Sequence, residues 1–207
     1  MTLKLYTAPG ACSLAPHIVL EELQLPHQIR IVKWGDKPAR AELKEINAMG
    51  QVPTLITEEG YMLAEGAAIM QYLLSKKPNK LFPESGKPRF KAFEWMNFIA
   101  TTLHKGCFSP LFNPGSFSDD ETDFEAIKRV TMKRLMDTLQ IVEDRFSDRD
   151  YVLGSDFSVV DPYLFTVLRW SDNFKIDLTP YKKIDNFMQK MARRPSVIAA
   201  MKAEGLL

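Results

Sequence analysis

The feature that most constrains this fold is a change in the pattern of hydrophobic residues near residue 80. Before it, short alternating or β-branched runs are interleaved with helical stripes, and after it only helical spacing recurs. The first part predicts the order β-α-β-α-β-β-α, with strands at 3–7, 28–32, 52–57 and 61–64 and helices at 13–23, 40–46 and 67–75. Strands that alternate with helices and end in a hairpin indicate a mixed sheet covered by helices.

The segment 76–88 separates the two patterns and contains three prolines and four lysines. Such a composition is typical of a linker or domain boundary. Beyond it we expect helices at 89–105, 121–146, 163–173, 180–193 and 195–204, the third of them apolar on nearly every side and therefore buried. We predict an α/β unit over residues 1–80, a linker over 81–88 and an all-helical bundle over 89–207.

Charge and cysteine content exclude several classes of function. Lys and Arg total 27 against 26 Asp and Glu, a balance that argues against a nucleic-acid or anionic-membrane partner. The two cysteines are far apart and form neither a disulfide framework nor a CxxC motif. The sequence shows no signal-peptide pattern and no apolar run long enough for a membrane helix. We expect a cytoplasmic protein.

Cys12 and Ser13 follow a Pro-Gly turn and stand at the predicted start of a helix. A helix N-terminus carries about half a positive charge and unpaired N–H groups, and it lowers the pKa of a thiol from about 8.5. The position suits either a reactive Cys12 or a bound substrate thiolate, with Ser13 as a hydroxyl donor. The alternative is a buried structural cysteine followed by a capping serine.

Two further places suit the ends of a peptide-like ligand. A cis Val52-Pro53 bond would expose the Val52 backbone at a sheet edge, where an extended peptide can pair. Only about 5–6% of X–Pro bonds are cis, so the sequence alone favours an ordinary trans proline. Glu65 and Gly66 stand between a strand and a helix, where they suit an ammonium and a carboxylate. A capping pair without a ligand is the alternative there.

Asn97, Thr101 and His104 have spacings that place them on one face of a helix. This polar stripe is either a solvated face with a core histidine or part of a catalytic site. His17 and His27 have no supporting constellation in the sequence, and we interpret both as structural. Since no metal-ligand spacing is present, we expect no metal site.

Several motifs occur in a characteristic order along the chain. They are Pro9-Gly-Ala-Cys-Ser-Leu-Ala-Pro-His17, Gly50-Gln-Val-Pro53, Glu65-Gly-Ala-Ala-Ile-Met-Gln-Tyr72, Glu94-Trp95 with Asn97-Phe-Ile-Ala-Thr101, Leu103-His-Lys-Gly106 and Asp161-Pro-Tyr-Leu-Phe-Thr-Val-Leu-Arg-Trp170. Together they resemble the bacterial beta-class glutathione S-transferases over nearly the whole chain. The resemblance implies a thioredoxin-like N-terminal domain, a helical C-terminal domain and a homodimer.

The resemblance also implies glutathione as co-substrate, a small hydrophobic electrophile as second substrate, and no metal. It gives catalytic roles to Cys12, Ser13 and His104, with Cys12 lying against the glutathione sulfur and able to form a mixed disulfide with it. The glutathione-binding residues that it implies are Trp34, Lys37, Gln51, Val52, Pro53, Glu65, Gly66, Asn97, Thr101 and Lys105. Lys33 is the alternative to Lys37 at the glycyl carboxylate, and we assign Phe108, Phe112 and Trp170 to the electrophile pocket.

The chain departs from the family pattern at two places. Cys107 is an extra residue before Phe108, and the loop 113–122 is longer and more polar than expected. Both lie close to the expected electrophile site, so electrophile preference is left open. Two other functions also stay open: a glutathione-dependent thiol–disulfide reductase or peroxidase that uses Cys12 covalently, and a non-catalytic ligand-binding protein on the same fold.

Overall fold

The computed structural model describes residues 2–146 and 150–207; residue 1 and residues 147–149, which belong to the two predicted units, lie outside the described residues. One sheet contains the strands β1 (Leu3–Thr7), β2 (His27–Ile31), β3 (Thr54–Ile56) and β4 (Met62–Ala64) in the order β2-β1-β3-β4. β1 runs parallel to β2 and antiparallel to β3, and β3 runs antiparallel to β4. The predicted mixed sheet is confirmed.

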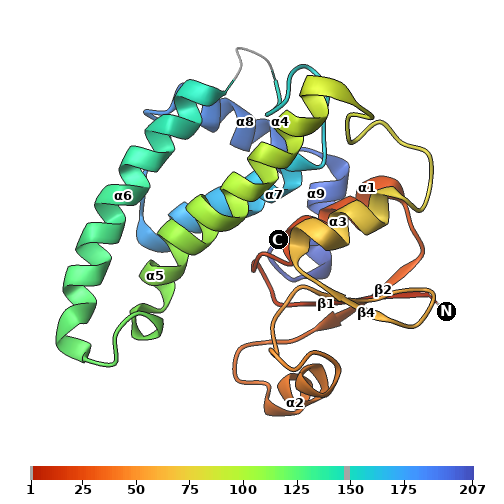
Figure 1. Cartoon of the computed structure of the whole chain (residues 1–207), viewed down its shortest axis with the longest axis horizontal. Helices are drawn as coiled ribbons and strands as arrows, with labels where there is room; N and C mark the ends of the chain where they lie inside the picture. The colour runs from red at the N-terminus through yellow and green to blue at the C-terminus, as the bar shows by residue number, and fades with distance from the viewer. Residues whose placement is uncertain (1, 147–149) are drawn as a thin grey trace.

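Helices cover both faces of this sheet. In Figure 1, α2 (Lys37–Ile46) lies on one side, and α1 (Leu14–Leu23) and α3 (Gly66–Leu74) lie on the other. Alternate side chains of β1 serve the two faces, since Leu5 belongs to the main core and Tyr6 to a smaller core under α2. The main core continues from α1 and α3 into the helical part, so the sheet and the bundle share one buried cluster.

The helical part packs around one fully buried helix. Its elements are α4 (Gly86–Asn97), η1 (Phe98–Phe108), α5 (Ser109–Phe112), η2 (Pro114–Ser116), η3 (Glu121–Asp123), α6 (Phe124–Arg145), α7 (Val160–Leu168), η4 (Arg169–Phe174), α8 (Lys182–Ala192) and α9 (Pro195–Ala203). All nine residues of α7 are buried, as the apolar pattern predicts. The α/β-then-helical fold class is confirmed, while the domain boundary at 81–88 stays a prediction.

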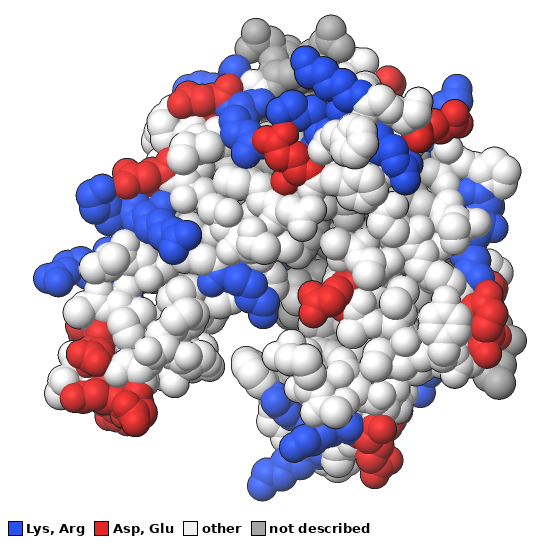
Figure 2. Space-filling view, in the orientation of Figure 1, with Lys and Arg blue, Asp and Glu red and all other residues white. Residues whose placement is uncertain are grey.

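The surface agrees with the balanced composition. Figure 2 shows side chains of both signs interspersed over one face, and a hollow that opens between the helical part and the part that carries the sheet. Among the helices of residues 2–146 and 150–207, none combines the length and apolar character needed to cross a membrane.

A π-helical segment replaces the second half of the helix that we predict over 89–105. From Phe98 to Phe108 the backbone hydrogen bonds span five residues instead of four, so the predicted helix over 89–105 is observed, with a π-helical second half. Cys107, the extra residue, lies in this segment, buried, with its Sγ 3.5 Å from Thr138 Oγ1. A Cβ at Gly106 would lie 3.1 Å from the Thr101 carbonyl oxygen and 3.1 Å from Nη2 of Arg134, so a larger residue there would crowd both groups.

A buried carboxylate joins the end of the chain to β1 and α1. Glu204, which follows α9, is 5% exposed. Its carboxylate accepts hydrogen bonds from the Gly10 N–H at 3.0 Å and the Thr7 hydroxyl at 2.8 Å, and it lies 2.9 Å from Nδ1 of His17. A buried charge is tolerated when donors surround it in this way. The polar side chains of the core therefore fix how α9 sits on the sheet-bearing part.

Asp161 organises the start of α7 in a similar manner. Its Oδ1 accepts the Val152 N–H at 2.8 Å, and its Oδ2 accepts the N–H and the hydroxyl of Ser158 at 2.6 and 2.7 Å. The carboxylate thus reaches back to Ser158, as the acidic residue of a capping box does. The Ser158 hydroxyl donates to Asp161 instead of capping the helix, so α7 begins only at Val160. Burial raises the pKa of Asp161 to about 6, although these hydrogen bonds lower it.

We expect Asp161→Asn to lower the free energy of unfolding by about 1–3 kcal/mol, because an amide has one acceptor oxygen and leaves a buried donor unpaired. Urea unfolding followed by circular dichroism measures the change. Asp156→Asn, at an exposed position in the preceding loop, is the matched control and should stay within about 0.5 kcal/mol of wild type. Equal midpoints for the two variants would contradict this account of Asp161.

Candidate functional site

Cys12 lies in the turn between β1 and α1. Gly10 has a φ of 71°, which favours glycine and sets the turn. On one side the Cys12 thiol donates to the Val52 carbonyl, with 3.4 Å between Sγ and the oxygen. On the other side the indole N–H of Trp170 donates to the Gly10 carbonyl at 2.8 Å. Contacts from the sheet-bearing part and from the helical part thus hold the turn.

Cys12 is a neutral thiol at physiological pH. Burial raises the pKa of Cys12 to about 11, although the Lys105 ammonium and the backbone N–H groups of Cys12 and Ser13 lower it. The Glu65 carboxylate raises it further. The prediction that the helix terminus lowers the pKa of Cys12 is therefore wrong, because loss of hydration outweighs the favourable dipole and charge. Cys12 can still donate a hydrogen bond.

The Ser13 hydroxyl points into the interior. Its oxygen lies 2.7 Å from the Thr7 hydroxyl and accepts the Ala8 N–H at 3.1 Å. Thr7 has a single hydroxyl proton, which goes to the acceptor-only Glu204 carboxylate, so Ser13 donates to Thr7. The Ser13 hydroxyl is thus engaged inside the protein, and its role as a donor to a ligand sulfur stays a prediction. Only the backbone N–H of Ser13 faces the Cys12 sulfur.

The backbone of Val52 is available for pairing. The Val52-Pro53 bond is cis, so the trans form that the sequence favours is not observed. β3 lies between β1 and β4, so the Val52 backbone is exposed ahead of an inner strand and not along the edge of the sheet. Val52 precedes the paired residues of β3, and no residue in the described part of the chain accepts a hydrogen bond from its N–H. Gln51 lies beside it, exposed, with its carbonyl accepting the Thr54 hydroxyl at 2.7 Å.

Glu65 and Gly66 lie next to Val52 and Pro53. A Cβ on Gly66 would lie 3.6 Å from Cγ of Pro53, so the start of α3 touches this segment. The first N–H groups of α3 have no partner within the helix. Glu65 is exposed and has a φ of 64°, an uncommon conformation for a residue with a side chain. Such strain recurs at ligand clamps, and it supports a binding role for Glu65.

His104 and Lys105 reach the same region from η1. The Lys105 side chain is exposed, and its charge acts on Cys12. His104 is half-buried, and its ring centroid lies 4.8 Å from that of Trp170. Burial and the Lys105 charge lower the pKa of His104 to about 4. His104 is therefore neutral at physiological pH, and the positive charge of this pair belongs to Lys105.

Asn97 and Thr101 do not share the surroundings of His104. Both are exposed and bond to their own helix: the Asn97 amide donates to the Phe93 carbonyl, and the Thr101 hydroxyl donates to the Asn97 carbonyl. The prediction of one polar stripe is wrong for His104, because the π-helical winding after residue 97 changes the spacing that aligns neighbouring turns.

Trp34 and Lys37 lie in and just after the segment that joins β2 to α2. Trp34 is 89% exposed, and the Arg40 guanidinium lies 4.7 Å from its ring centroid. Lys33 and Lys37 are also exposed. Within the described residues no hydrogen bond or ion pair ties Trp34 or Lys37 to Cys12, so their glycyl role stays a prediction.

The three residues predicted as electrophile-pocket walls belong to one aromatic cluster. Phe112 is 47% exposed, and its ring centroid lies 5.6 Å from that of Trp170 and 4.8 Å from that of Phe174. Phe108 has no exposed surface and packs behind Trp170. The prediction of a wall position is therefore wrong for Phe108, because its ring completes the core.

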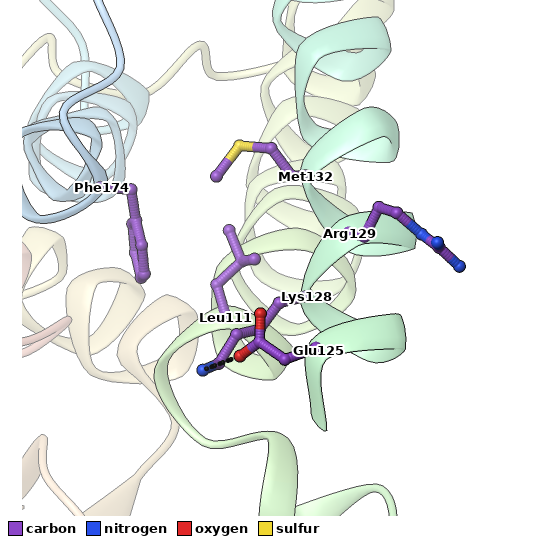
Figure 3. A pocket seen from close by; sticks show the side chains of 6 residues that line it. All are labelled: Leu111, Glu125, Lys128, Arg129, Met132 and Phe174. Atoms are coloured by element: carbon purple, nitrogen blue, oxygen red, sulfur yellow. Dashed lines mark hydrogen bonds and ion pairs between the residues drawn. The ribbon is translucent and has the colours of Figure 1, made fainter. Parts of the chain in front are cut away.

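A pocket of about 420 Å³ adjoins this cluster between α5, α6 and η4 (Figure 3). Its lining residues are Leu111, Glu125, Lys128, Arg129, Met132 and Phe174. Leu111, Met132 and Phe174 face one another across it, whereas Arg129 points away. Phe174 connects the pocket to Phe112 and Trp170, so apolar surface continues outward from the aromatic cluster.

Tyr163 is linked electrostatically to the site in a way that the sequence does not reveal. It is buried on α7, which packs on α1, and burial raises its pKa. The negative charge of Glu65, and of Cys12 once it ionises, raises that pKa further. The sequence places Tyr163 in an apolar run and gives no sign of this coupling.

The comparisons with known proteins cover the whole chain. The glutathione S-transferase N-terminal domain model matches residues 10–76, and the C-terminal domain model matches residues 100–195. The chain is 40% identical to glutathione S-transferase GstA of Escherichia coli O157:H7, over 99% of this chain and 100% of that protein.

Solved structures give the same result. A glutathione transferase homolog from Sulfitobacter with bound glutathione has a TM-score of 0.91 and 32% identity, covering 100% of this chain and 99% of that one. A beta-class glutathione S-transferase from Sphingomonas chungbukensis has a TM-score of 0.85 and 34% identity, covering 99% and 100%. The chain therefore belongs to the glutathione S-transferase family, and it is similar over its whole length to the bacterial beta class.

Proposed function

We propose that this protein is a glutathione transferase that joins the sulfur of glutathione to a small apolar electrophile. The observation that carries the proposal is the convergence of four separate segments on Cys12: the Val52 backbone, the Glu65-Gly66 start of α3, Lys105 of η1 and the start of α1. An extended, anionic, thiol-bearing peptide needs each of these features.

Each feature has a proposed place along glutathione. The free N–H of Val52 pairs with the cysteinyl residue as a short added strand. The Glu65 carboxylate and the first N–H groups of α3 hold the ammonium and the carboxylate of the γ-glutamyl end. Lys37, or Lys33 beside it, meets the glycyl carboxylate. The glutathione sulfur then lies against Cys12, within reach of the Lys105 charge.

The site favours loss of the proton from the glutathione thiol because it stabilises the thiolate anion that results. Lowering a thiol pKa by two units corresponds to about 2.7 kcal/mol, which a nearby ammonium and a few charge-assisted hydrogen bonds can supply. Cys12 contributes as a donor, because its S–H proton turns from the Val52 carbonyl to the glutathione sulfur. His104 is neutral and acts through its ring, whereas Lys105 supplies the charge.

Conjugation is favoured over covalent redox chemistry by the state of Cys12. A covalent role requires the Cys12 thiolate, and a pKa of about 11 leaves little of it near pH 7. The exposed ring of Phe112 and the adjoining apolar pocket are the proposed place for the electrophile. We also propose that two copies assemble as a dimer, which the exposed Phe90 and Tyr61 support.

Cys12→Ala separates the two chemistries. We expect conjugation of glutathione to a chlorinated nitroaromatic to fall by no more than about tenfold, the worth of one hydrogen bond, and glutathione-dependent disulfide reduction to be lost. Steady-state kinetics on both substrates measures this, with Cys107→Ala as the control. Loss of both activities would show a covalent role for Cys12. If the wild-type protein conjugated glutathione to none of several electrophiles, the proposed function would be overturned.

The raised pKa of Cys12 predicts the pH dependence of its alkylation. Below its pKa the thiolate fraction increases about tenfold per pH unit, so the iodoacetamide rate at Cys12 should still be rising at about pH 10. Free glutathione, whose thiol is near the usual cysteine pKa of about 8.5, should level off earlier. Mass spectrometry of the Cys12 peptide gives the rate. A plateau by about pH 8 would contradict the thiol state assigned here.

Glu65→Gln tests the γ-glutamyl clamp. A charge-assisted hydrogen bond contributes about 1.5–3 kcal/mol, so we expect the Kd of glutathione to rise about 10- to 100-fold. Isothermal titration calorimetry measures the Kd. Glu45→Gln, at an exposed position on α2, is the matched control and should bind like wild type. Unchanged affinity in the Glu65 variant would remove this residue from the site.

A further inference from the structure

Two histidines and a glutamate meet along one side of α1, from its first half to its last turn. His17 and Glu21 lie one turn apart on α1, and His27 is the first residue of β2. One ligand atom from each of the three lies within 4.8 Å of the others. Nε2 of His27 is 3.5 Å from Oε1 of Glu21, and Nε2 of His17 is 4.0 Å from the same oxygen.

The other ring nitrogen of each histidine fixes its tautomer. Nδ1 of His17 lies 2.9 Å from the Glu204 carboxylate, and Nδ1 of His27 lies 2.7 Å from the Leu25 carbonyl. Both oxygens only accept, so each Nδ1 carries the hydrogen. In the neutral rings Nε2 then presents a lone pair. Histidines that bind metals are held in this way, with the second N–H given to a carboxylate or a carbonyl.

Nε2 of His17, Nε2 of His27 and the Glu21 carboxylate therefore face one another, and each can serve as a ligand atom. Nε2 of His17 is fully buried and has no hydrogen-bond partner among residues 2–146 and 150–207. A proton on it would lie too far from Glu21 to be shared, because 4.0 Å exceeds hydrogen-bond length. Buried polar atoms are rarely left unpaired in proteins. A cation at the centre of the three side chains would satisfy all of them.

We propose that His17, Glu21 and His27 form a binding site for a divalent transition-metal ion of the zinc type. Two imidazole nitrogens and one carboxylate are a known protein ligand set for zinc, with water in the fourth position. Tetrahedral zinc separates its ligand atoms by roughly 3.4 Å, given bond lengths of about 2.0–2.1 Å. The 3.5 Å between Nε2 of His27 and Oε1 of Glu21 already fits. The 4.0 Å between Nε2 of His17 and the same oxygen needs a small movement of Glu21.

The surroundings give the ion a route and a role. The Glu21 side chain is 29% exposed and that of His27 is 14% exposed, whereas His17 is fully buried. The ion therefore enters past Glu21, and a solvent water completes its shell. Bound there, it ties the last turns of α1 to the first residue of β2 and braces the helix whose other end carries the Cys12 turn. This site is separate from the proposed glutathione site.

The test uses the full-length protein without a histidine tag, reduced, freed of metal by a chelator and kept free of glutathione. Co²⁺ is titrated in as the probe, and Zn²⁺ is then added to displace it. We expect saturable binding in the micromolar range, with the visible absorption of four- or five-coordinate Co²⁺ and no thiolate-to-metal band. Zn²⁺ should also raise the thermal midpoint of unfolding.

His27→Gln and Glu21→Gln test the ligands without disturbing the buried His17. Loss of a residue that only supports a ligand costs about 10- to 100-fold in affinity, so each variant should bind at least about 100-fold more weakly. His104→Gln and Cys12→Ala are the controls and should bind Co²⁺ as wild type does, with circular dichroism to show that all four fold. Absence of saturable binding, wild-type affinity in either ligand variant, or loss of binding in Cys12→Ala would overturn the proposal.

Discussion

The buried Glu204 carboxylate is the interaction on which the rest of this structure depends. It gathers donors from β1, from the turn before α1 and from α1 itself. Because an unpaired buried charge is very costly, these donors cannot drift away from it. The Cys12 turn is thus fixed from beneath by Glu204 and from the side by the Trp170 indole. The same carboxylate accepts from Nδ1 of His17 and sets the tautomer of that ring. It thus links the Cys12 turn to the cluster of His17, Glu21 and His27.

The site combines the desolvated thiol of Cys12 with the exposed charges of Lys105 and Glu65. Around Cys12 the loss of hydration outweighs the helix terminus and Lys105, so the protein's own thiol stays protonated. A neutral donor and an adjacent exposed cation are a suitable environment for an incoming thiolate that brings its own negative charge. The exposed Lys105 is the cation of this pair and acts on Cys12, whereas His104, neutral beside it, adds no further charge.

The sequence predicts what depends on local pattern. Strand alternation and helical stripes give the element order, and the apolar run around residues 163–173 marks the buried α7, since periodicity follows directly from which face is covered. Contacts between distant segments are not encoded in this way. His17 and Glu204 are 187 residues apart, and the buried α7 meets α1 only through tertiary packing. The left-handed backbone of Glu65 and the π-helical winding after residue 97 arise where the folded chain overrides local preference.

The long separation of Glu204 from its partners along the chain has a consequence for biosynthesis. A ribosome releases the sheet-bearing segment first, and domains begin to fold as they emerge. Glu204, the shared partner of Gly10, Thr7 and His17, is made 187 residues after His17. Until then the nascent chain can pair its strands but lacks the carboxylate that holds the turn before α1. The turn that carries Cys12 therefore reaches its final geometry only after residue 204 has been synthesised.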